Sequence, residues 1–463
     1  MSVAEQLADL LDPEAVTTAA GDLAAHSSDW APGALLARRR GEAPAPPACV
    51  VRPRSTAEVA TLLAWAHDTE TPVVPWGGGS GVLASAAPEG RVVVDLSELD
   101  GLGAVDEKSR LVRAGAGVTG PALHDHLGAA GYLLGHEPQS LAISTVGGWI
   151  ATRACGQLSA RYGGIESLLA GFTAVLPGGR VVRSKTVPRR AAGPDVASLM
   201  LGSEGTLGIV TEADLRVSPV PESRTDVCLR FEHMADGVAA CRKLVQSDLD
   251  PTLVRLYDAD DAAIFLRHFP GEAPGPLLLL SFDGRGDAWR AGAAAELCGG
   301  SSGAPALVAH WWEHRNDAVD EFRRLMAGEG ILGPHGLVET MEVAGTWTVL
   351  RDLYHSMKER LSAVADLAGC HLSHVYPDGA CLYFTLAAAC GDDAGAERKL
   401  ATWWETGMRT CLDAGGSISH HHGIGRVKAP WLEEELGGWM EVLRAVKRAV
   451  DPRNVMNPGA LGL

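Results

Sequence analysis

The stretch VVPWGGGSGVLA, residues 73–84, decides how the rest of this 463-residue chain is interpreted. Its first residues, Val73–Pro75, have the composition of a short buried strand, and Trp76 leads into three consecutive glycines, Ser80 and a fourth glycine. Glycine has no Cβ atom, so such a turn can adopt positive φ angles and approach a ligand closely. Its consecutive N–H groups can converge into a nest that suits a pyrophosphate. Alone, the pattern is equally consistent with an ordinary surface loop, and no G-x-G-x-x-G opens a helix here.

Length and composition narrow the class of protein. A chain of 463 residues exceeds the size at which one hydrophobic core keeps growing, so we expect two domains. Hydrophobic residues at 46% and charged residues at 21% are typical of a well-packed soluble protein. The formal net charge of −17 disfavours nucleic acid or an anionic membrane as a partner, and an anionic substrate would need a local basic site.

Targeting and redox signals point to the cytoplasm. The nine cysteines are scattered with no C-x-x-C pair, a pattern typical of reduced thiols. No apolar run approaches membrane-spanning length, and neither a signal peptide nor a peroxisomal address at Leu461–Leu463 is present. We therefore expect a cytoplasmic enzyme with a small-molecule substrate, no transmembrane segment and no nucleic-acid partner, and we consider a homodimer as its assembly.

The first half of the chain alternates between helical and strand patterns. We expect a docking helix at 2–11, an entry loop at 32–47, a capping box at Ser55–Glu58, strands at 91–96, 110–114 and 209–217, a helix at 121–129 and a hairpin at 172–183. The run GHEPQSLAISTVGGWIATRACGQLSARYGG, residues 135–164, is too irregular for a helix and too glycine-rich for a plain strand.

The pattern changes after Pro219 and Pro221. Strands expected at 227–231, 253–257 and 277–282 alternate with helices at 237–245 and 259–267, which indicates an antiparallel sheet backed by helices. A further helix is expected at 439–450. We divide the chain into an N-terminal helix and entry loop (1–45), a first domain (46–221), a cap or substrate domain (222–411) and a C-terminal segment that returns to the first domain (412–463).

Six motifs occur in order along the chain: PWGGGSG, GHEPQSLAISTVGGWIATRACG, GPDVASLMLGSEGTLGIVTEADLRV, HVYPDGACLYF, GGSISHHHGIG and VDPRNV. From about Pro47 onward they resemble the flavoproteins of the vanillyl-alcohol oxidase and p-cresol methylhydroxylase (PCMH) superfamily. Within it, the alkyldihydroxyacetonephosphate synthase branch is the most similar. The resemblance implies an α+β fold, with a PCMH-type FAD-binding domain of two subdomains and an antiparallel-sheet and helix cap domain.

The same resemblance implies a noncovalent FAD with its pyrophosphate on the glycine-rich turn. The cofactor-binding residues that it implies are Pro75, Trp76, Gly77, Gly78, Gly79, Ser80, Gly81, Gln139, Ser140, Leu141, Ser144, Thr145, Gly148, Trp149, Thr152, Glu204, Thr206, Gly208, Ile209 and Val210. Gln139 stands where relatives often carry an aspartate. The resemblance also places His136 near the isoalloxazine, as a candidate catalytic residue.

Tyr383 and the histidines His420, His421 and His422 are the other catalytic candidates. Tyr383 matches the tyrosine to which proton transfer is assigned in the synthase branch; the alternative is a core tyrosine on a strand at 381–386. Three adjacent imidazoles in a glycine-flanked turn can serve as acid, base or phosphate donor, and the alternative is a solvated polar loop.

We expect no metal, although some hydroxy-acid dehydrogenases of the superfamily bind one. The weak candidates for ligands are His371, His374 and His421, because imidazole clusters suit zinc or a similar ion. His421, however, occupies the position of the usual glutamate, and Tyr383 replaces a histidine.

One departure from the synthase branch directs the functional prediction. That branch carries an arginine that holds the substrate phosphate, and our count places Gly328 at its position. We therefore expect an FAD-dependent oxidase or dehydrogenase of a small polar substrate, such as a hydroxy acid or an amine. It would act by proton abstraction and hydride transfer to flavin N5, with oxygen or an electron carrier reoxidising the flavin. The alternatives are ether-bond formation through a flavin N5 adduct, as in the synthase, and a metal-assisted 2-hydroxy-acid dehydrogenase.

Overall fold

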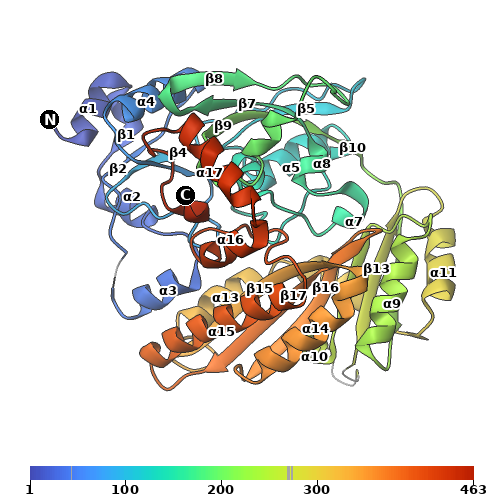
Figure 1. Ribbon diagram of the computed structural model, residues 1–463. Helices are drawn as coiled ribbons and strands as arrows, with labels where there is room; N and C mark the ends of the chain where they lie inside the picture. Colours follow the sequence, from blue (N-terminus) through green and yellow to red (C-terminus); the bar gives the residue numbers. More distant parts are fainter. Residues whose placement is uncertain (43, 268, 270–271, 273–274) are drawn as a thin grey trace. The chain divides into compact units, whose positions relative to one another are not determined.

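The computed structural model describes residues 1–42, 44–267, 269, 272 and 275–463. Its contacts divide the chain into two compact units, and each is described by itself. The first unit comprises Met1–Ala154, Gly164–Val220 and His421–Leu463; the second comprises Cys155–Gly163 and Pro221–His420. Both units combine helices with sheets, as the α+β expectation requires (Figure 1).

The first unit contains a small sheet that carries the glycine-rich turn at a strand end. Its order is β1-β2-β4-β3, with β2 and β3 parallel to β4, and its strands are β1 Val16–Thr17, β2 Cys49–Val51, β3 Val73–Trp76 and β4 Val92–Asp95. Helix α4 (Thr56–Asp68) links β2 to β3 and buries its apolar face. This strand–helix–strand unit was expected from the sequence.

Two local expectations near the N-terminus need correction. Residues 32–47 do not form only a loop, because Pro32–Arg39 is helix α3: Pro32 occupies the first turn and Leu36 is buried. At α4, Ser55 accepts a hydrogen bond from the Glu58 N–H, but the Glu58 carboxylate accepts from Arg54 instead of Ser55. The full capping box is found at α1 (Val3–Leu10), the expected docking helix.

A second, antiparallel sheet of the first unit has the order β5-β9-β7-β8. Its strands are β5 Leu111–Gly115, β7 Leu169–Leu176, β8 Arg180–Arg183 and β9 Ile209–Arg216, and the expected hairpin is β7–β8. The other elements of the unit are α2 Ala20–Ala25, α5 Gly120–Ala129, β6 Tyr132–Leu133, α6 Val146–Thr152, α8 Ile165–Leu168, β10 Ser218–Pro219, α16 Ala429–Leu436 and α17 Trp439–Val450.

Helix α6 contradicts the expectation that the run 135–164 is too irregular for a helix. The Thr145 side chain caps it by accepting a hydrogen bond from the Gly148 N–H. Val146, Trp149 and Ile150 are buried, so tertiary packing outweighs the low helix propensity of Gly147–Gly148.

The second unit is built on a seven-stranded antiparallel sheet, as the alternating pattern predicted. The strand order is β14-β11-β13-β12-β16-β17-β15, with β11 Arg224–Arg230, β12 Leu253–Tyr257, β13 Leu277–Asp283, β14 Ser301–Ser302, β15 Gly336–Thr346, β16 Leu367–Val375 and β17 Gly379–Ala389. Its helices are α7 Ser159–Tyr162, α9 Met234–Val245, α10 Ala259–Leu266, α11 Asp287–Cys298, α12 Ala306–His314, α13 Ala318–Met326, α14 Trp347–Ser362 and α15 Asp393–Asp413.

The two faces of this sheet differ in polarity. Alternate residues of β16 and β17, such as Leu372, Leu382 and Phe384, are fully buried, and Phe384 stacks on Tyr354 of α14. Side chains alternate along a strand, so the residues between these apolar ones point to the opposite face of the sheet. His371 and Tyr383 are among them. This polar face provides the candidate proton-transfer groups.

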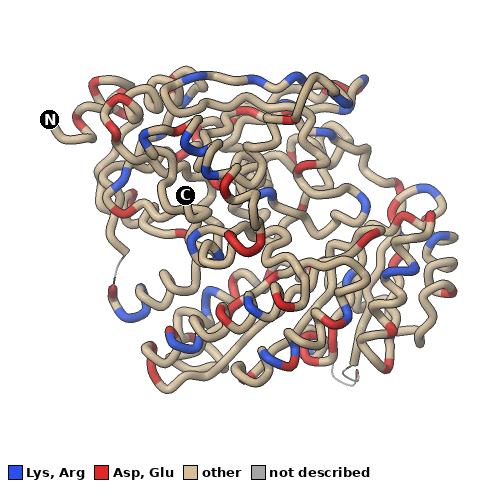
Figure 2. The backbone as a smooth tube through the Cα atoms, in the orientation of Figure 1, with Lys and Arg blue, Asp and Glu red and all other residues tan. Residues whose placement is uncertain are grey.

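Charges of both signs are interspersed along the two units (Figure 2). The net charge of −17 therefore arises from a modest excess of acidic residues throughout the chain rather than from an acidic tract.

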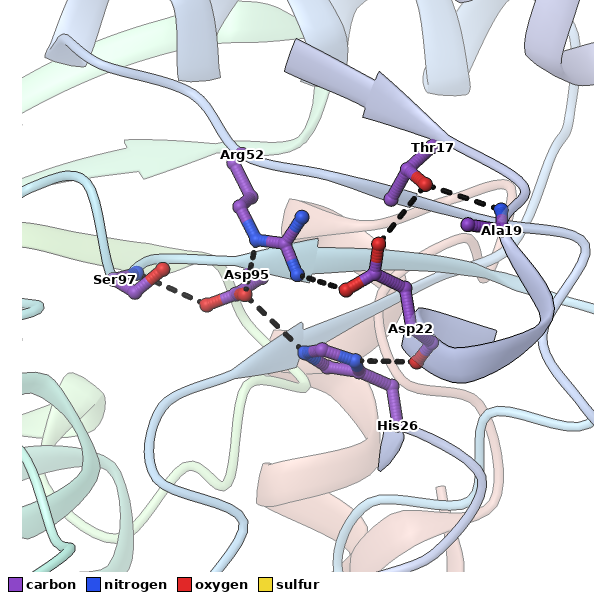
Figure 3. Close-up of polar contacts among 7 residues, drawn as sticks. All are labelled: Thr17, Ala19, Asp22, His26, Arg52, Asp95 and Ser97. Carbon is purple, nitrogen blue, oxygen red and sulfur yellow. Dashed lines mark hydrogen bonds and ion pairs between the residues drawn. The ribbon is translucent and has the colours of Figure 1, made fainter. Parts of the chain in front are cut away.

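A polar network in the first unit joins α2 to β2 and β4 (Figure 3). Arg52 donates to Asp95 at 2.9 Å and to Asp22 at 2.8 Å. The His26 ring contacts the Asp22 carbonyl oxygen at 2.7 Å and the Asp95 carboxylate at 3.2 Å, and it lies 5.1 Å from the ring of Trp76. Both partners of the imidazole are acceptors, so only the imidazolium form satisfies both.

This network predicts a pH-dependent contribution to the stability of the first unit. Burial alone would lower the pKa of His26, but the bonds to Asp95 and Asp22 outweigh it and raise that pKa. The contribution of a group with a raised pKa is fully present below its unfolded-state pKa of about 6.5 and is lost as the pH rises through the folded-state value. We expect His26→Gln to lower the stability by about 1–2 kcal/mol at pH 6 and by less at pH 9.

The measurement is thermal unfolding of the wild type and the variant at both pH values. His124→Gln, on the exposed side of α5, is the matched control and should change neither midpoint. An equal loss for His26→Gln at pH 6 and pH 9 would contradict the imidazolium assignment.

Candidate active site

The glycine-rich turn lies against the second motif so closely that side chains do not fit between them. A Cβ atom on Gly78 would lie 1.8 Å from the Ile143 carbonyl oxygen, and one on Gly77 would lie 2.4 Å from Oγ1 of Thr145. Gly79 has a φ of +64° and faces the Trp76 ring. From the sequence, these glycines were expected to allow the close approach of a ligand. In the structure the missing side chain of Gly78 makes room for the protein's own backbone, and those of Gly77 and Gly79 make room for the side chains of Thr145 and Trp76.

The N–H groups of the turn are nevertheless available to an anion. Within the described chain, none of the backbone N–H groups of Gly77, Gly78, Gly79, Ser80 and Gly81 donates a hydrogen bond. Successive unpaired N–H groups at a glycine-rich bend are the donor set that a pyrophosphate requires. The donors present here therefore fit the diphosphate of a dinucleotide.

Glu204 joins the third motif to the C-terminal segment. Its buried carboxylate accepts from the N–H groups of Ile424 at 2.7 Å and Gly425 at 2.9 Å. Burial raises the pKa of Glu204 despite these bonds. Because the backbone N–H groups occupy the carboxylate oxygens, this side chain orders the turn that follows the histidines, which the sequence analysis did not foresee.

The remaining candidate cofactor residues of the first unit lie on four segments. Pro75 and Trp76 end β3, and Gly205 packs on the Pro75 ring with no room for a Cβ atom. The others are Gln139, Ser140 and Leu141 in the turn before α6; Ser144, Thr145, Gly148, Trp149 and Thr152 at α6; and Thr206, Gly208, Ile209 and Val210 at the start of β9.

His136 is buried without a hydrogen-bond partner. It is 2% exposed, and neither Nδ1 nor Nε2 has a partner in the described chain. Its ring meets Trp149 edge-on with the centroids 4.7 Å apart, and burial lowers its pKa to about 3. An unsatisfied buried imidazole is costly, so this neutral side chain fits a ligand that donates to it or accepts from it.

In the second unit, the strand register places four titratable residues in one row. Tyr257 on β12 pairs with His371 on β16, His371 pairs with Tyr383 on β17, and Tyr383 pairs with Glu342 on β15. All four side chains are at most 9% exposed. The row is a result of sheet register, which the sequence alone could not supply.

His371 has partners that the sequence analysis missed. Its Nδ1 lies 2.8 Å from Oδ2 of Asp261 at the start of α10, and its ring stacks on Tyr383 with centroids 4.7 Å apart. The Arg255 guanidinium lies 3.4 Å from the same Nδ1 and donates to the Tyr257 hydroxyl at 2.8 Å. Burial, followed by the charge of Arg255, lowers the pKa of His371 to about 4.

His374 points to a different group because β16 is irregular there. Its φ is +48°, and the register shifts between Ser373 and Val375, as in a β-bulge. Its Nδ1 hydrogen-bonds with the Ser159 hydroxyl at 2.8 Å, and its ring stacks on His420. Potential ligand atoms of Cys155, His374 and His420 all lie within 4.8 Å of one another.

The boundary between the two units falls within the HHH loop. His420 lies in the second unit, where its Nε2 hydrogen-bonds with the Tyr376 hydroxyl at 2.9 Å and its backbone N–H donates to Glu342. His421 and His422 lie in the first unit, with ring centroids 4.5 Å apart. That the three histidines act together stays a prediction.

Gly328, which stands where the synthase branch carries a phosphate-binding arginine, is a turn residue. Its φ is +82°, and a Cβ atom would lie 2.6 Å from the Pro334 carbonyl oxygen. An arginine could not occupy this conformation without a rearrangement, so the glycine has a structural explanation. Among the described residues, Arg255 is a cation that lies beside the titratable row.

Comparison with known proteins identifies the family. The family "FAD linked oxidases, C-terminal domain" matches residues 220–461, more than half of the chain, and the "FAD binding domain" family matches residues 47–185. An uncharacterized FAD-linked oxidoreductase of Escherichia coli strain K12 is 31% identical over 443 residues, which cover 90% of this chain and 89% of that protein. The chain belongs to the FAD-linked oxidase family.

Other members of the family differ in the reaction that they catalyse. An alkyldihydroxyacetonephosphate synthase of Caenorhabditis elegans is 30% identical over 470 residues, covering 91% of this chain and 77% of that protein. A D-lactate dehydrogenase of Anaerostipes hadrus is 28% identical over 433 residues, covering 90% and 89%. Membership of the FAD-linked oxidase family therefore establishes the cofactor FAD and an enzyme, but not the reaction.

Two solved structures confirm the fold. An alkyldihydroxyacetonephosphate synthase superposes with a TM-score of 0.80 at 25% identity, over 98% of this chain and 84% of its own. A p-cresol methylhydroxylase superposes with a TM-score of 0.74 at 17% identity, over 99% and 96%. The resemblance to this superfamily, inferred from the motifs, is confirmed. Among the described residues, no helix is both long and apolar enough to cross a bilayer.

The unsatisfied imidazole of His136 predicts an effect on FAD affinity. We expect His136→Phe to keep or raise the stability of the apoprotein, because no protein hydrogen bond is lost, and to weaken FAD binding at least tenfold, equivalent to about 1.4 kcal/mol. Flavin fluorescence titration of the apoprotein measures the affinity. His126→Phe is the control: it removes a bond to the Gly103 carbonyl oxygen and should lower stability without affecting FAD. Unchanged FAD affinity in His136→Phe would contradict the assignment.

Proposed function

We propose that the chain is an FAD-dependent oxidase or dehydrogenase of a small polar substrate, such as a hydroxy acid or an amine. Proton transfer involves Tyr383, with the residues of the His420–His422 loop and His136 assisting. Oxygen or an electron carrier is the final acceptor. The single observation that supports this function best is the row of titratable side chains on one face of the second unit's sheet, with Tyr383 inside it.

Tyr383 suits the role of a proton donor or relay. Burial raises its pKa, so the phenol stays protonated at neutral pH. Its two cross-strand neighbours, His371 and Glu342, can exchange or stabilise a proton without leaving the sheet. Bound FAD would supply the two-electron acceptor, and the residues of the second unit would manage the proton that leaves the substrate.

The first alternative is synthase chemistry, in which an ether bond forms without net oxidation. It is favoured by the synthase of Caenorhabditis elegans and by the synthase structure among the relatives. The absence of an arginine at Gly328 argues against it less strongly than the sequence suggested, because Arg255 lies beside His371 and could hold a phosphate.

The second alternative is a metal-assisted hydroxy-acid dehydrogenase. The group Cys155, His374 and His420 offers sulfur and imidazole ligands of the type that zinc prefers. These are not the three weak candidates named from the sequence: His374 is retained, whereas His371 bonds to Asp261. Loss of activity with a chelator and its return with zinc or manganese would favour this alternative.

The decisive experiment is anaerobic mixing of the holoenzyme with hydroxy acids, amines and, separately, acyl-dihydroxyacetone phosphate plus a long-chain alcohol. We expect a hydroxy acid or an amine to bleach the flavin absorbance stoichiometrically. Release of fatty acid and formation of an ether lipid without lasting flavin reduction would contradict the proposal. Acid precipitation of the same protein should release FAD into the supernatant, as noncovalent binding requires.

Tyr383→Phe provides the matching variant. We expect it to retain FAD and thermal stability while the rate of flavin reduction falls by about two or more orders of magnitude, the usual scale for a group in acid–base catalysis. Tyr132→Phe is the control, because that tyrosine lies on β6 of the first unit, outside the candidate site. It should change neither the FAD content nor the rate, and a normal rate in Tyr383→Phe would show that this tyrosine has only a core role.

A further inference from the structure

The contact between Asp261 and His371 has the geometry of an oriented base. A neutral histidine carries its proton on the nitrogen that meets an acceptor, and the Asp261 carboxylate lies 2.8 Å from Nδ1. The Arg255 guanidinium at 3.4 Å is only a donor and cannot compete for that proton. The proton therefore stays on Nδ1, and the lone pair of His371 is on Nε2.

The Nε2 atom belongs to a largely buried side chain, since His371 is 4% exposed. It makes no hydrogen bond with any residue in the described part of the chain, and unlike the nitrogens of His136 it is not completely buried. Its ring stacks on the ring of Tyr383 at 4.7 Å. An acceptor nitrogen therefore lies beside the phenol to which proton transfer is assigned.

The chain makes specific room for the pair. Gly369 precedes His371 by two residues on β16, so both lie on the same side of the strand. A Cβ atom on Gly369 would lie 3.1 Å from the Cα atom of Asp261, and its absence lets the start of α10 approach the strand. The Asp258 side chain caps α10 by accepting from the Asp261 N–H, which fixes the position of the carboxylate.

We propose that His371 is the catalytic base of the second unit and that Asp261 is the residue that positions it, an inference that rests on the proposed oxidation. The O–H or N–H bond of the substrate breaks, and its proton goes to Nε2 of His371. The electron pair left on the heteroatom forms the double bond to carbon. The carbon-bound hydrogen leaves with two electrons, which pass to the bound flavin.

Arg255 indicates the class of substrate. Its charge helps to keep His371 neutral, and the other ionisable groups that face the imidazole are Asp261, Tyr257 and Tyr383. A carboxylate or phosphate bound to Arg255 would offset this charge and make the imidazole a stronger base when substrate is present. The arrangement favours an anionic hydroxy compound over an amine.

The test compares four variants of the holoenzyme in anaerobic stopped-flow reduction with the best substrate of the panel. His371→Phe and Asp261→Asn should retain FAD and thermal midpoint, and both should reduce the flavin at least a hundredfold more slowly with little change in substrate Kd. Asp260→Asn is the matched control: it makes the same chemical change one residue away, at an exposed carboxylate paired with Lys358, and should have the normal rate. Added imidazole should partly restore His371→Ala.

The outcomes separate this inference from the proposed function. If no substrate of the panel reduces the wild-type flavin, the oxidation itself is wrong. If the wild type is reduced and His371→Phe or Asp261→Asn is reduced equally fast, His371 is not the base. Should His371→Phe fail to fold, the isosteric Asp261→Asn decides, and slow reduction with intact FAD content supports the base.

Discussion

The candidate cofactor site of the first unit depends on the close approach of Gly77–Gly78 to the backbone of Ile143 and the side chain of Thr145. The Cβ positions of these glycines fall within 2.4 Å of atoms on the other segment, so even alanine would force the two apart. The same type of contact recurs where Gly425 meets the Leu83 carbonyl oxygen. Because these segments are far apart in the sequence, the glycines hold together the loops that carry unpaired N–H groups and His136. A binding surface for FAD is thus a consequence of close backbone packing.

In the second unit, the positions of the polar side chains depend on a different constraint, the register of an antiparallel sheet. A shift of one residue in the β16–β17 pairing would move His371 and Tyr383 to opposite faces, because side chains alternate along a strand. The apolar residues of the other face, including Leu372 and Phe384, prevent this shift by requiring burial. The hydrophobic half of each strand therefore fixes the geometry of the polar half.

The sequence predicted what depends on local pattern and on motifs. The glycine-rich turn, the β7–β8 hairpin, the antiparallel sheet and the FAD-linked family all follow from residues close together in the chain. It failed at α3, where Pro32 begins a helix made largely of good helix formers, and at α6, where burial of an apolar side outweighs the low propensity of two glycines. It could not predict the pair Asp261–His371 or the bonds from Glu204 to Gly425, because these residues are separated by 110 and 221 positions and meet only through the fold.

The electrostatic environment distinguishes His371 from Tyr383 on the polar face, which neither the motifs nor the strand register do. Burial pushes the pKa of His371 down to about 4 and the pKa of Tyr383 up from its ordinary value, so at neutral pH a neutral imidazole stacks on a protonated phenol. Two adjacent groups whose environments move their pKa values apart are already assigned to opposite roles, one as acceptor and one as donor. The net charge of −17 does not set this assignment, because the charges that act on the pair are the local ones of Arg255, Asp261, Glu342 and Glu339. The local environment, and not the overall charge, therefore sets the direction in which a proton can move on this face.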